Sequence, residues 1–139
     1  MGMSRQAMDK LVNEHFMYEA TADLEDVMGT YTEDPLHHVV GGPDGPLRGK
    51  PAIRGFYQRL FPALKGERAE NLMRVYGEDL IVDETILIGT VVDGRPFSLP
   101  GRRGENVRVR LLHVFKLRDG LIADEKVWFD ADELRRQLK

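Results

Sequence analysis

The stretch from residue 107 to residue 129 constrains the fold more than any other part of this chain. Along residues 107–117, every second side chain is apolar apart from one histidine, which is the period of a strand with one buried face. Arg118-Asp119-Gly120 is a turn signal, and residues 121–129 repeat the same alternation with one glutamate. These residues predict two antiparallel strands whose apolar faces continue one another.

The two polar exceptions on these faces are His113 and Glu125. If Leu117 pairs with Leu121 across the turn, the register places His113 directly opposite Glu125. The sequence therefore predicts a histidine–glutamate pair on a face that is otherwise apolar.

Further hairpin signals precede these strands. Residues 72–76 predict a short strand and residues 80–92 a long one, and Asp93-Gly94 predicts a two-residue hairpin turn after the long strand. We expect residues 98–106 to form a polar loop that lengthens this hairpin.

Helical periodicity dominates the first half of the chain. Apolar residues recur at positions 8, 11, 12 and 16 with His15 on the same face, which predicts an amphipathic helix. Asp23 suits the N-cap of a short second helix, and Pro51 suits the first turn of a third helix that ends near residues 62–66. Between these helices the sequence predicts a strand over residues 35–40 and a loop over residues 41–49.

Asp130, followed three residues later by Glu133, is typical of the cap of a C-terminal helix. The predicted order is thus helix, helix, strand, helix, a run of antiparallel strands and a last helix. This order indicates the α+β class, with helices covering one face of a curved sheet.

Composition narrows the class of protein. The 139 residues include no cysteine, which excludes disulfides and thiolate chemistry, and the length suits a single domain over residues 1–139. Twenty Lys and Arg residues against 23 Asp and Glu residues give a net charge of −3, which argues against a partner such as nucleic acid or an anionic membrane. The chain has no 18-residue apolar run and no sign of a targeting peptide, so we expect a cytoplasmic location.

The predicted order of elements occurs together with four local motifs, which are Tyr31-Thr-Glu-Asp34, Gly45-Pro-Leu-Arg-Gly49, Ala52-Ile-Arg-Gly-Phe-Tyr57 and Phe115-Lys-Leu-Arg-Asp-Gly-Leu-Ile122. With them the chain, over about residues 5–138, resembles the SnoaL-like polyketide cyclases and ketosteroid isomerases of the nuclear transport factor two-like superfamily. The resemblance implies a cone, in which a strongly curved, mostly antiparallel sheet wraps around a long N-terminal helix. It also implies an apolar pocket between helix and sheet, and a homodimer.

The resemblance implies site residues as well, and several of the familiar catalytic groups are replaced. The position of the catalytic aspartate of ketosteroid isomerases holds Val39, and those of the tyrosine and protonated aspartate that bind the oxyanion hold His15 and His113. A supporting tyrosine is retained as Tyr57. The position of the last-strand aspartate of SnoaL-like cyclases and limonene epoxide hydrolases holds Val127.

The arginine and second aspartate of the epoxide hydrolases align with Glu84 and Ile86, so epoxide hydrolysis by that mechanism is not expected. Glu84 faces either the pocket or a dimer interface. Trp128 lies on the opposite face of its strand from Glu125, where we expect it to pack in the dimer.

The ionisable residues on apolar faces suggest the chemistry. His113 is the predicted general base, Glu125 its orienting partner, and His15 with Tyr57 the donors that stabilise an enolate oxygen. The alternative is a structural role, in which the buried histidine and glutamate only hydrogen-bond to each other and take no part in catalysis. The predicted substrate-binding set adds further residues to Tyr57, and these are Glu84, Val39, Val127, Phe115 and Phe129.

No metal or cofactor is expected. His37 and His38 are adjacent on a predicted strand, so they point to opposite faces and cannot bind one ion together. One of them lines the mouth of the pocket, and the sequence leaves open which one.

These residues favour an enzyme that abstracts a proton next to the carbonyl of a small apolar compound, as an isomerase, dehydratase or aldol-type cyclase does. The missing aspartates leave a non-catalytic binder of a small ligand as an alternative. A protein-interaction domain is the third possibility, and it gains weight if Phe56, Phe115 and Phe129 fill the cone and leave no cavity.

Overall fold

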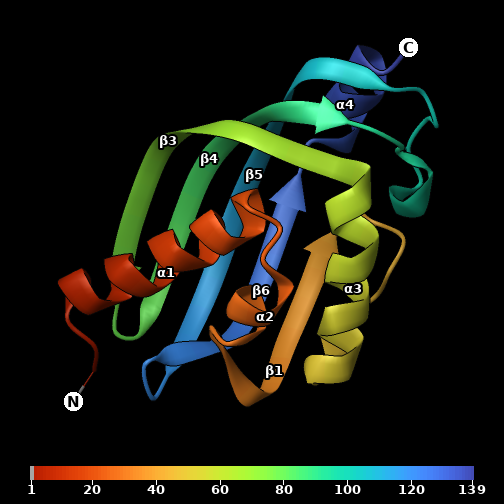
Figure 1. The fold of residues 1–139 in the computed structure, drawn as a ribbon. Coiled ribbons are helices and arrows are strands. Elements are labelled where there is room, and N and C mark those ends of the chain that lie inside the picture. Colours follow the sequence, from red (N-terminus) through yellow and green to blue (C-terminus); the bar gives the residue numbers. More distant parts are fainter. Residues whose placement is uncertain (1) are drawn as a thin grey trace.

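The computed structural model describes residues 2–139, and one curved, unclosed sheet organises them (Figure 1). The strand order is β2-β1-β6-β5-β4-β3, with β1 and β6 parallel and every other pair antiparallel. The α+β class predicted from the sequence is confirmed. The strands are β1 (Tyr31–Val40), β2 (Leu47–Arg48), β3 (Leu64–Gly77), β4 (Leu80–Val91), β5 (Gly104–Arg118) and β6 (Leu121–Phe129).

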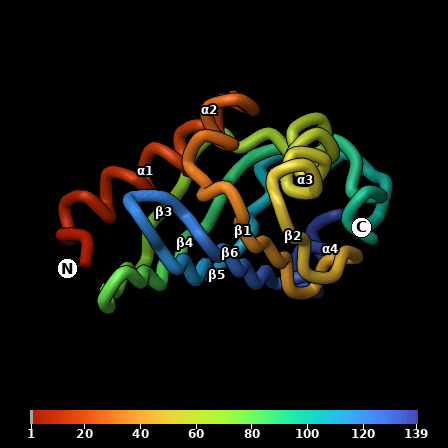
Figure 2. Tube along the Cα trace, turned by 90° about the horizontal axis from the view of Figure 1, so that it is seen from below, coloured from red at the N-terminus to blue at the C-terminus, as the bar shows by residue number. Residues whose placement is uncertain are grey.

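Three helices, α1 (Arg5–Ala20), α2 (Leu24–Met28) and α3 (Lys50–Ala63), lie on one side of this sheet (Figure 2). The predicted caps are confirmed, because the side chain of Asp23 accepts from the backbone of Asp26 and that of Asp130 from the backbone of Glu133. Asp130 is the N-cap of α4 (Ala131–Gln137), which packs against β5. None of the helices in residues 2–139 combines the length and the apolarity that a membrane crossing requires.

Strand β3 is much longer than the predicted 72–76, and β1 begins four residues before the predicted 35–40. β3 forms one edge of the sheet, and most of its residues are exposed, the apolar Leu72, Met73 and Val75 included. An edge strand of this kind carries no apolar alternation, so periodicity reveals only its most apolar part.

Asp93-Gly94 does not form the predicted two-residue hairpin turn. β4 ends at Val91 and β5 begins at Gly104, and the loop between them contains a short 3-10 helix, η1 (Arg95–Phe97). The carboxylate of Asp93 accepts from the backbone N–H of Arg95 and starts this helix instead of closing a hairpin.

The predicted register of β5 and β6 is wrong. Asp119 and Gly120 alone form the turn, with φ angles of 55° and 78°, so Arg118 pairs with Leu121. Two consecutive left-handed residues make the tight turn that suits the twist of a hairpin, and glycine adopts the second without strain.

A bulge then shifts the pairing once more, because Lys116 pairs with Asp124 but Leu117 pairs with Ile122. As a result His113 lies opposite Val127, and Glu125 lies opposite Phe115. The two shifts together move the strand by two residues, which keeps His113 and Glu125 on the same face as diagonal neighbours.

Candidate active site

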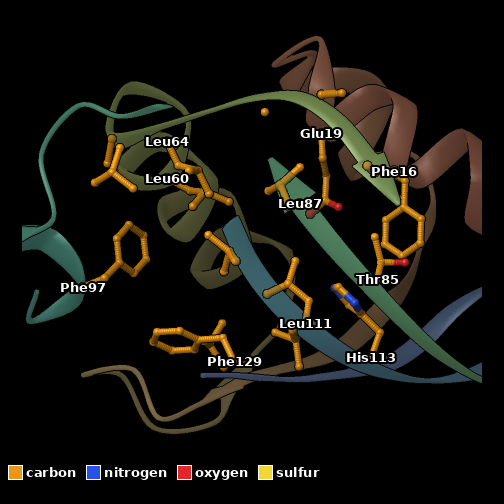
Figure 3. Close-up of a pocket in the computed structure, with 18 of the residues that line it drawn as sticks. Phe16, Glu19, Leu60, Leu64, Thr85, Leu87, Phe97, Leu111, His113 and Phe129 are labelled. Carbon is orange, nitrogen blue, oxygen red and sulfur yellow. The ribbon is translucent and has the colours of Figure 1, made fainter. Parts of the chain in front are cut away.

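A cavity of about 410 Å³ lies between the helices and the inner face of the sheet (Figure 3). Glu19, Thr85 and His113 gather at one end of it with Phe16, and apolar side chains surround the other end. Aromatic side chains therefore do not fill the cone, and the filled core that would favour a protein-interaction domain is not observed. The apolar end is lined by Leu60, Leu64, Leu87, Phe97, Leu111 and Phe129 among others.

Glu125 of β6 is the centre of the polar end, although only 1% of the residue is exposed. The hydroxyl of Tyr31 donates to its Oε1 at 2.6 Å, and Nε2 of His15 lies 3.2 Å from the same oxygen. On its other oxygen, Oε2, Nε2 of His113 lies at 3.7 Å and Nε2 of His37 at 3.9 Å. One buried carboxylate thus faces three imidazole rings and a phenol.

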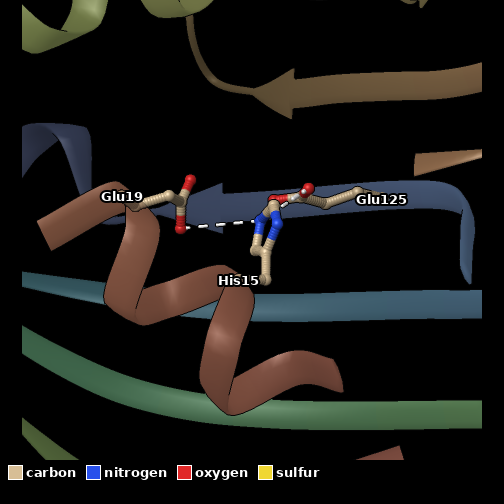
Figure 4. Close-up of side chains that lie close together, drawn as sticks. All are labelled: His15, Glu19 and Glu125. Atoms are coloured by element: carbon tan, nitrogen blue, oxygen red, sulfur yellow. Dashed lines mark ion pairs between the residues drawn. The ribbon is translucent and has the colours of Figure 1, made fainter. Parts of the chain in front are cut away.

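The hydrogen bonds of Thr30 fix the protonation of His15. The hydroxyl of Thr30 donates its only proton to the carbonyl of Val27 at 2.6 Å, so it accepts from Nδ1 of His15 at 2.9 Å. Nδ1 therefore carries a proton, and Nε2 is the ring atom that faces the carboxylates of Glu19 and Glu125 (Figure 4).

His15 is the fixed positive charge of the site. Burial alone would lower the pKa of His15, but the negative charges of Glu19 and Glu125 outweigh burial and raise that pKa to about 9. In return, and against the effect of burial, the charge of His15 holds the pKa of Glu125 well below its usual range. At neutral pH these two groups form a buried ion pair.

Glu19 is a site residue that the sequence analysis missed. It follows His15 by one helical turn on α1, and its Oε1 lies 3.6 Å from Nε2 of His15. Its Oε2 is hydrogen-bonded to the hydroxyl of Tyr57 at 2.9 Å. Burial raises the pKa of Glu19 to about 7, since the repulsion from Glu125 adds to burial and the charge of His15 only partly opposes it. The four-residue spacing from His15 was the only signal in the sequence.

His113 lines the cavity, but its charge behaviour is the opposite of the sequence expectation. Burial lowers the pKa of His113 to about 4, and the nearby Glu125 only partly offsets this effect. Glu125 therefore does not make His113 basic, and the ring is neutral at pH 7. Its Nδ1 is buried and has no hydrogen-bond partner among the residues that the structure describes.

Of the two adjacent histidines, His37 is the one that faces inward. It is buried and lines the cavity, whereas His38 points away from it. Burial lowers the pKa of His37, and its Nδ1 also lacks a partner within residues 2–139.

The predicted substrate-binding residues divide into three groups. Val39, Val127 and Phe129 line the cavity. Phe115 and Tyr57 are fully buried behind its wall, where Phe115 stacks on His113. Glu84 lies on the outer face of β4 and binds Arg110 at 2.8 Å, so the expectation that Glu84 faces the pocket is not met.

A second buried carboxylate, Asp83 of β4, has different partners. Nε of Arg74 donates to it at 2.7 Å, Nδ2 of Asn71 at 2.8 Å and the hydroxyl of Thr85 at 2.6 Å. Arg74, Asn71 and Thr85 also line the cavity beside His113, which places further polar groups at the polar end.

His15, Glu19 and Glu125 present possible metal ligands within 4.8 Å of one another. The donor set does not favour a cation, because Nε2 of His15 carries a proton at neutral pH and Glu125 already accepts from Tyr31. We therefore treat the cluster as a proton-binding site.

An α+β cone with ionisable residues at one end of an apolar cavity defines a class of small proteins that share this fold with different chemistries. The family model of SnoaL-like domains matches residues 12–125, so the chain belongs to the SnoaL-like domain family, and the resemblance seen in the sequence is confirmed. No curated protein sequence matches the chain.

Solved structures share the fold at low sequence identity. A candidate isomerase from Bacillus subtilis is 14% identical, with 95% of this chain and 92% of that chain covered and a TM-score of 0.79. A candidate polyketide cyclase from Pseudomonas putida is 16% identical, with 93% and 96% covered and a TM-score of 0.78. An LEH-like epoxide hydrolase from Mycobacterium tuberculosis is 16% identical, with 96% and 90% covered and a TM-score of 0.70. Identities this low establish the shared fold and leave the reaction open.

Proposed function

We propose that this protein is an enzyme that moves a proton at a carbon next to the carbonyl group of a small, largely apolar compound. One observation carries the proposal: a carboxyl group whose pKa is near neutrality, Glu19, shares one end of an apolar cavity with a neutral histidine, His113. A general base works best when its pKa lies near the working pH.

The roles differ from those expected from the sequence. Glu19 takes the proton, because it is the group that is both partly ionised at pH 7 and accessible, with 22% of its side chain exposed. His113 stays neutral beside Glu19, and its single ring proton is on Nε2, toward Oε2 of Glu125 at 3.7 Å, so Nδ1 is left as a hydrogen-bond acceptor. Glu125 and His15 stay ionised and fix the field of the site. No cofactor is needed for this chemistry.

Hydrogen–deuterium exchange tests the proposal without knowledge of the substrate. A panel of apolar ketones and enones is incubated with the protein in D₂O, and mass spectrometry measures deuterium at the carbon next to the carbonyl. We expect Glu19→Gln to slow exchange at least about a hundredfold, as the loss of a general base does. Glu84→Gln is the matched control, since Glu84 lies outside the cavity, and it should leave the rate unchanged.

Binding without exchange of any compound would instead support the alternative, a non-catalytic binder of a small apolar ligand. That alternative shares the cavity but needs no group that titrates near neutrality.

The homodimer and the cytoplasmic location expected from the sequence remain predictions. The outer face of the sheet supports the homodimer, since Trp128 is 38% exposed there and pairs with Leu112 across the strands. Sedimentation of wild type and Trp128→Glu would test it, and a monomeric wild type would contradict it.

A further inference from the structure

Four oxygen-bearing side chains form a continuous line from the cavity into the core. Glu19 contacts Tyr57 at 2.9 Å, Tyr57 contacts Tyr31 at 2.7 Å, and Tyr31 contacts Glu125 at 2.6 Å. The two phenols and Glu125 are each at most 1% exposed. Each of these three oxygen–oxygen contacts is at hydrogen-bond distance.

A count of protons constrains this line. Three hydrogen bonds need three protons, but Tyr31 and Tyr57 carry one each. The third proton can come only from a carboxyl group at one end of the line. Glu125 is held ionised by His15, so Glu19 is the end that supplies it.

When Glu19 is protonated, it donates to Tyr57, Tyr57 donates to Tyr31, and Tyr31 donates to Glu125. When Glu19 is ionised, two protons are left for three contacts, and Tyr57 turns toward Glu19. Tyr31 then either stays on Glu125, which leaves no proton in the 2.7 Å contact between the phenols, or turns toward Tyr57 and fills that contact. In the second case Glu125 keeps only the charge of His15. The hydroxyl rotations break no covalent bond, and each phenol keeps its own proton.

We propose that Glu19 and Glu125 compete through Tyr57 and Tyr31 for one set of hydrogen-bond donors, so that both phenols reverse direction whenever Glu19 binds or releases its proton. Tyr31 and Tyr57 are then positioning residues that set the proton affinity of Glu19. The inference deepens the proposed function, on which it rests only in treating Glu19 as the catalytic base.

Other charged and titratable groups also surround this line. His15 on α1, His37 on β1 and His113 on β5 all face Glu125, and Arg74 on β3 lines the same cavity. None of them lies between Glu19 and Tyr57 or between Tyr57 and Tyr31. His15 also faces Glu19, at 3.6 Å, so the two carboxylates share its charge as well. The competition for hydrogen-bond donors passes through the phenols, and single oxygen deletions test that part while His15 stays in place.

The two deletions should shift the titration of Glu19 in opposite directions. Tyr57→Phe removes the only phenol that can donate to ionised Glu19, so the pKa of Glu19 should rise. Tyr31→Phe leaves that donor in place but removes the acceptor that Tyr57 needs when Glu19 is protonated, so the pKa of Glu19 should fall. A change in packing or in burial alone has no reason to produce opposite signs.

Nuclear magnetic resonance of the ligand-free protein, labelled with ¹³C at the side-chain carboxyl of glutamate, measures this titration. The Glu19 signal is assigned by its absence from Glu19→Gln. We expect the midpoint to move up by half a pH unit or more in Tyr57→Phe and down in Tyr31→Phe. Tyr76→Phe is the matched control, because the Tyr76 hydroxyl donates to Asp9 outside the line, and it should leave the midpoint in place. Shifts of the same sign, or no shift, would overturn the proposal.

A second measurement avoids the tyrosine variants altogether. In wild type labelled at tyrosine Cζ, the signals of Tyr31 and Tyr57 should both move in the pH step in which Glu19 titrates. In Glu19→Gln the amide does not titrate, so this step should vanish. A Tyr31 signal that stays constant through the Glu19 step would contradict the competition. Because no substrate is present, these results are independent of whether the exchange reaction occurs.

Discussion

Asp83 and Glu125 are both buried carboxylates at the polar end of the cavity, and they differ in the chemistry of their partners. The charged partner of Asp83 is Arg74, whose guanidinium does not give up a proton in proteins. The charged partner of Glu125 is His15, whose imidazolium can lose its proton, and a phenol and two further imidazoles complete its surroundings.

This difference separates a structural ion pair from a site that can handle protons. Asp83 has three donors at 2.6–2.8 Å, and its main partner keeps its charge at every physiological pH. Around Glu125 the number of bound protons can change, since the pKa of Glu19 is about 7 and that of His15 about 9. The permanence of the partner charge, more than burial, distinguishes the two clusters.

The largest effect on stability should follow from breaking the Asp83 pair. Asp83→Ala deprives three donors of their acceptor, and Arg74 loses its buried partner although its Nη1 keeps Asp9 at 3.0 Å. This should cost about 3–5 kcal/mol of unfolding free energy. Urea denaturation measures the loss, and Arg59→Ala, at an exposed pair with Asp44, serves as the control with a loss of at most about 1 kcal/mol. Equal losses in the two variants would remove the distinction between the clusters.

Glu125→Gln should cost less stability than Asp83→Ala, although Glu125 is equally buried. Without the carboxylate of Glu125, His15 still faces the carboxylate of Glu19 at 3.6 Å and can also release its proton, so no buried charge is left unpaired. The remaining loss is that of hydrogen bonds to a charged group, about 1.5–3 kcal/mol. If this variant is as unstable as Asp83→Ala in the same denaturation experiment, then His15 is left as an unpaired buried charge, and the titratable partner does not distinguish the two carboxylates.

The fold could be predicted from the sequence further than the site could. The period of residues 107–129, the caps Asp23 and Asp130 and the helical spacing around His15 are local signals, and the structure confirms the elements they predicted. Turn type and bulge are set by backbone geometry instead. For this reason the register between β5 and β6 could not be obtained from the pattern of apolar residues.

The candidate site shows the same limit. His15, His113 and Glu125 were found because they interrupt apolar faces, and the structure brings all three together. Glu19 was missed because a partly exposed glutamate on a helix is ordinary. Glu84 was included in the substrate-binding set with its face left open, because β4 carries apolar residues on both of its faces and alternation there does not show which face is inward. The protonation of a cluster depends on distances among segments far apart in the chain, which spacing does not reveal.

Alkaline pH should reduce the stability contributed by the cluster of His15, Glu19 and Glu125, and it should leave the ion pair of Asp83 with Arg74 unchanged. The pKa of His15 is about 9 in the folded protein against an ordinary value of 6.5, so its contribution is complete below pH 6.5 and is lost as the pH rises through 9. The stability that comes from the raised pKa of Glu19 also falls as the pH rises, but this contribution is already lost by about pH 7 to 8. We therefore expect the unfolding free energy to fall by about 1–2 kcal/mol between pH 7.5 and 9.5.

His15→Gln should make this part of the pH dependence flatter, because the titrating group is gone. Asn71→Ala, a change in the Asp83 cluster, should retain the wild-type slope. Thermal unfolding across the pH range measures both slopes. A slope in His15→Gln equal to that of wild type would show that another group titrates there.

The smallest expected effect concerns a neutral donor to Asp83. Asn71→Ala removes the hydrogen bond of 2.8 Å to Asp83 and a weaker one of 3.0 Å to Thr85, but Arg74 and Thr85 still donate to the carboxylate. Because the charge of Asp83 keeps Arg74 as its main partner, the unfolding free energy should fall by about 0.5–1.5 kcal/mol at every pH. Urea denaturation at pH 6 and pH 9 measures this loss. A loss that grows with pH would mean that Asn71 stabilises the proton-binding cluster as well, and the two carboxylates would then belong to one coupled network.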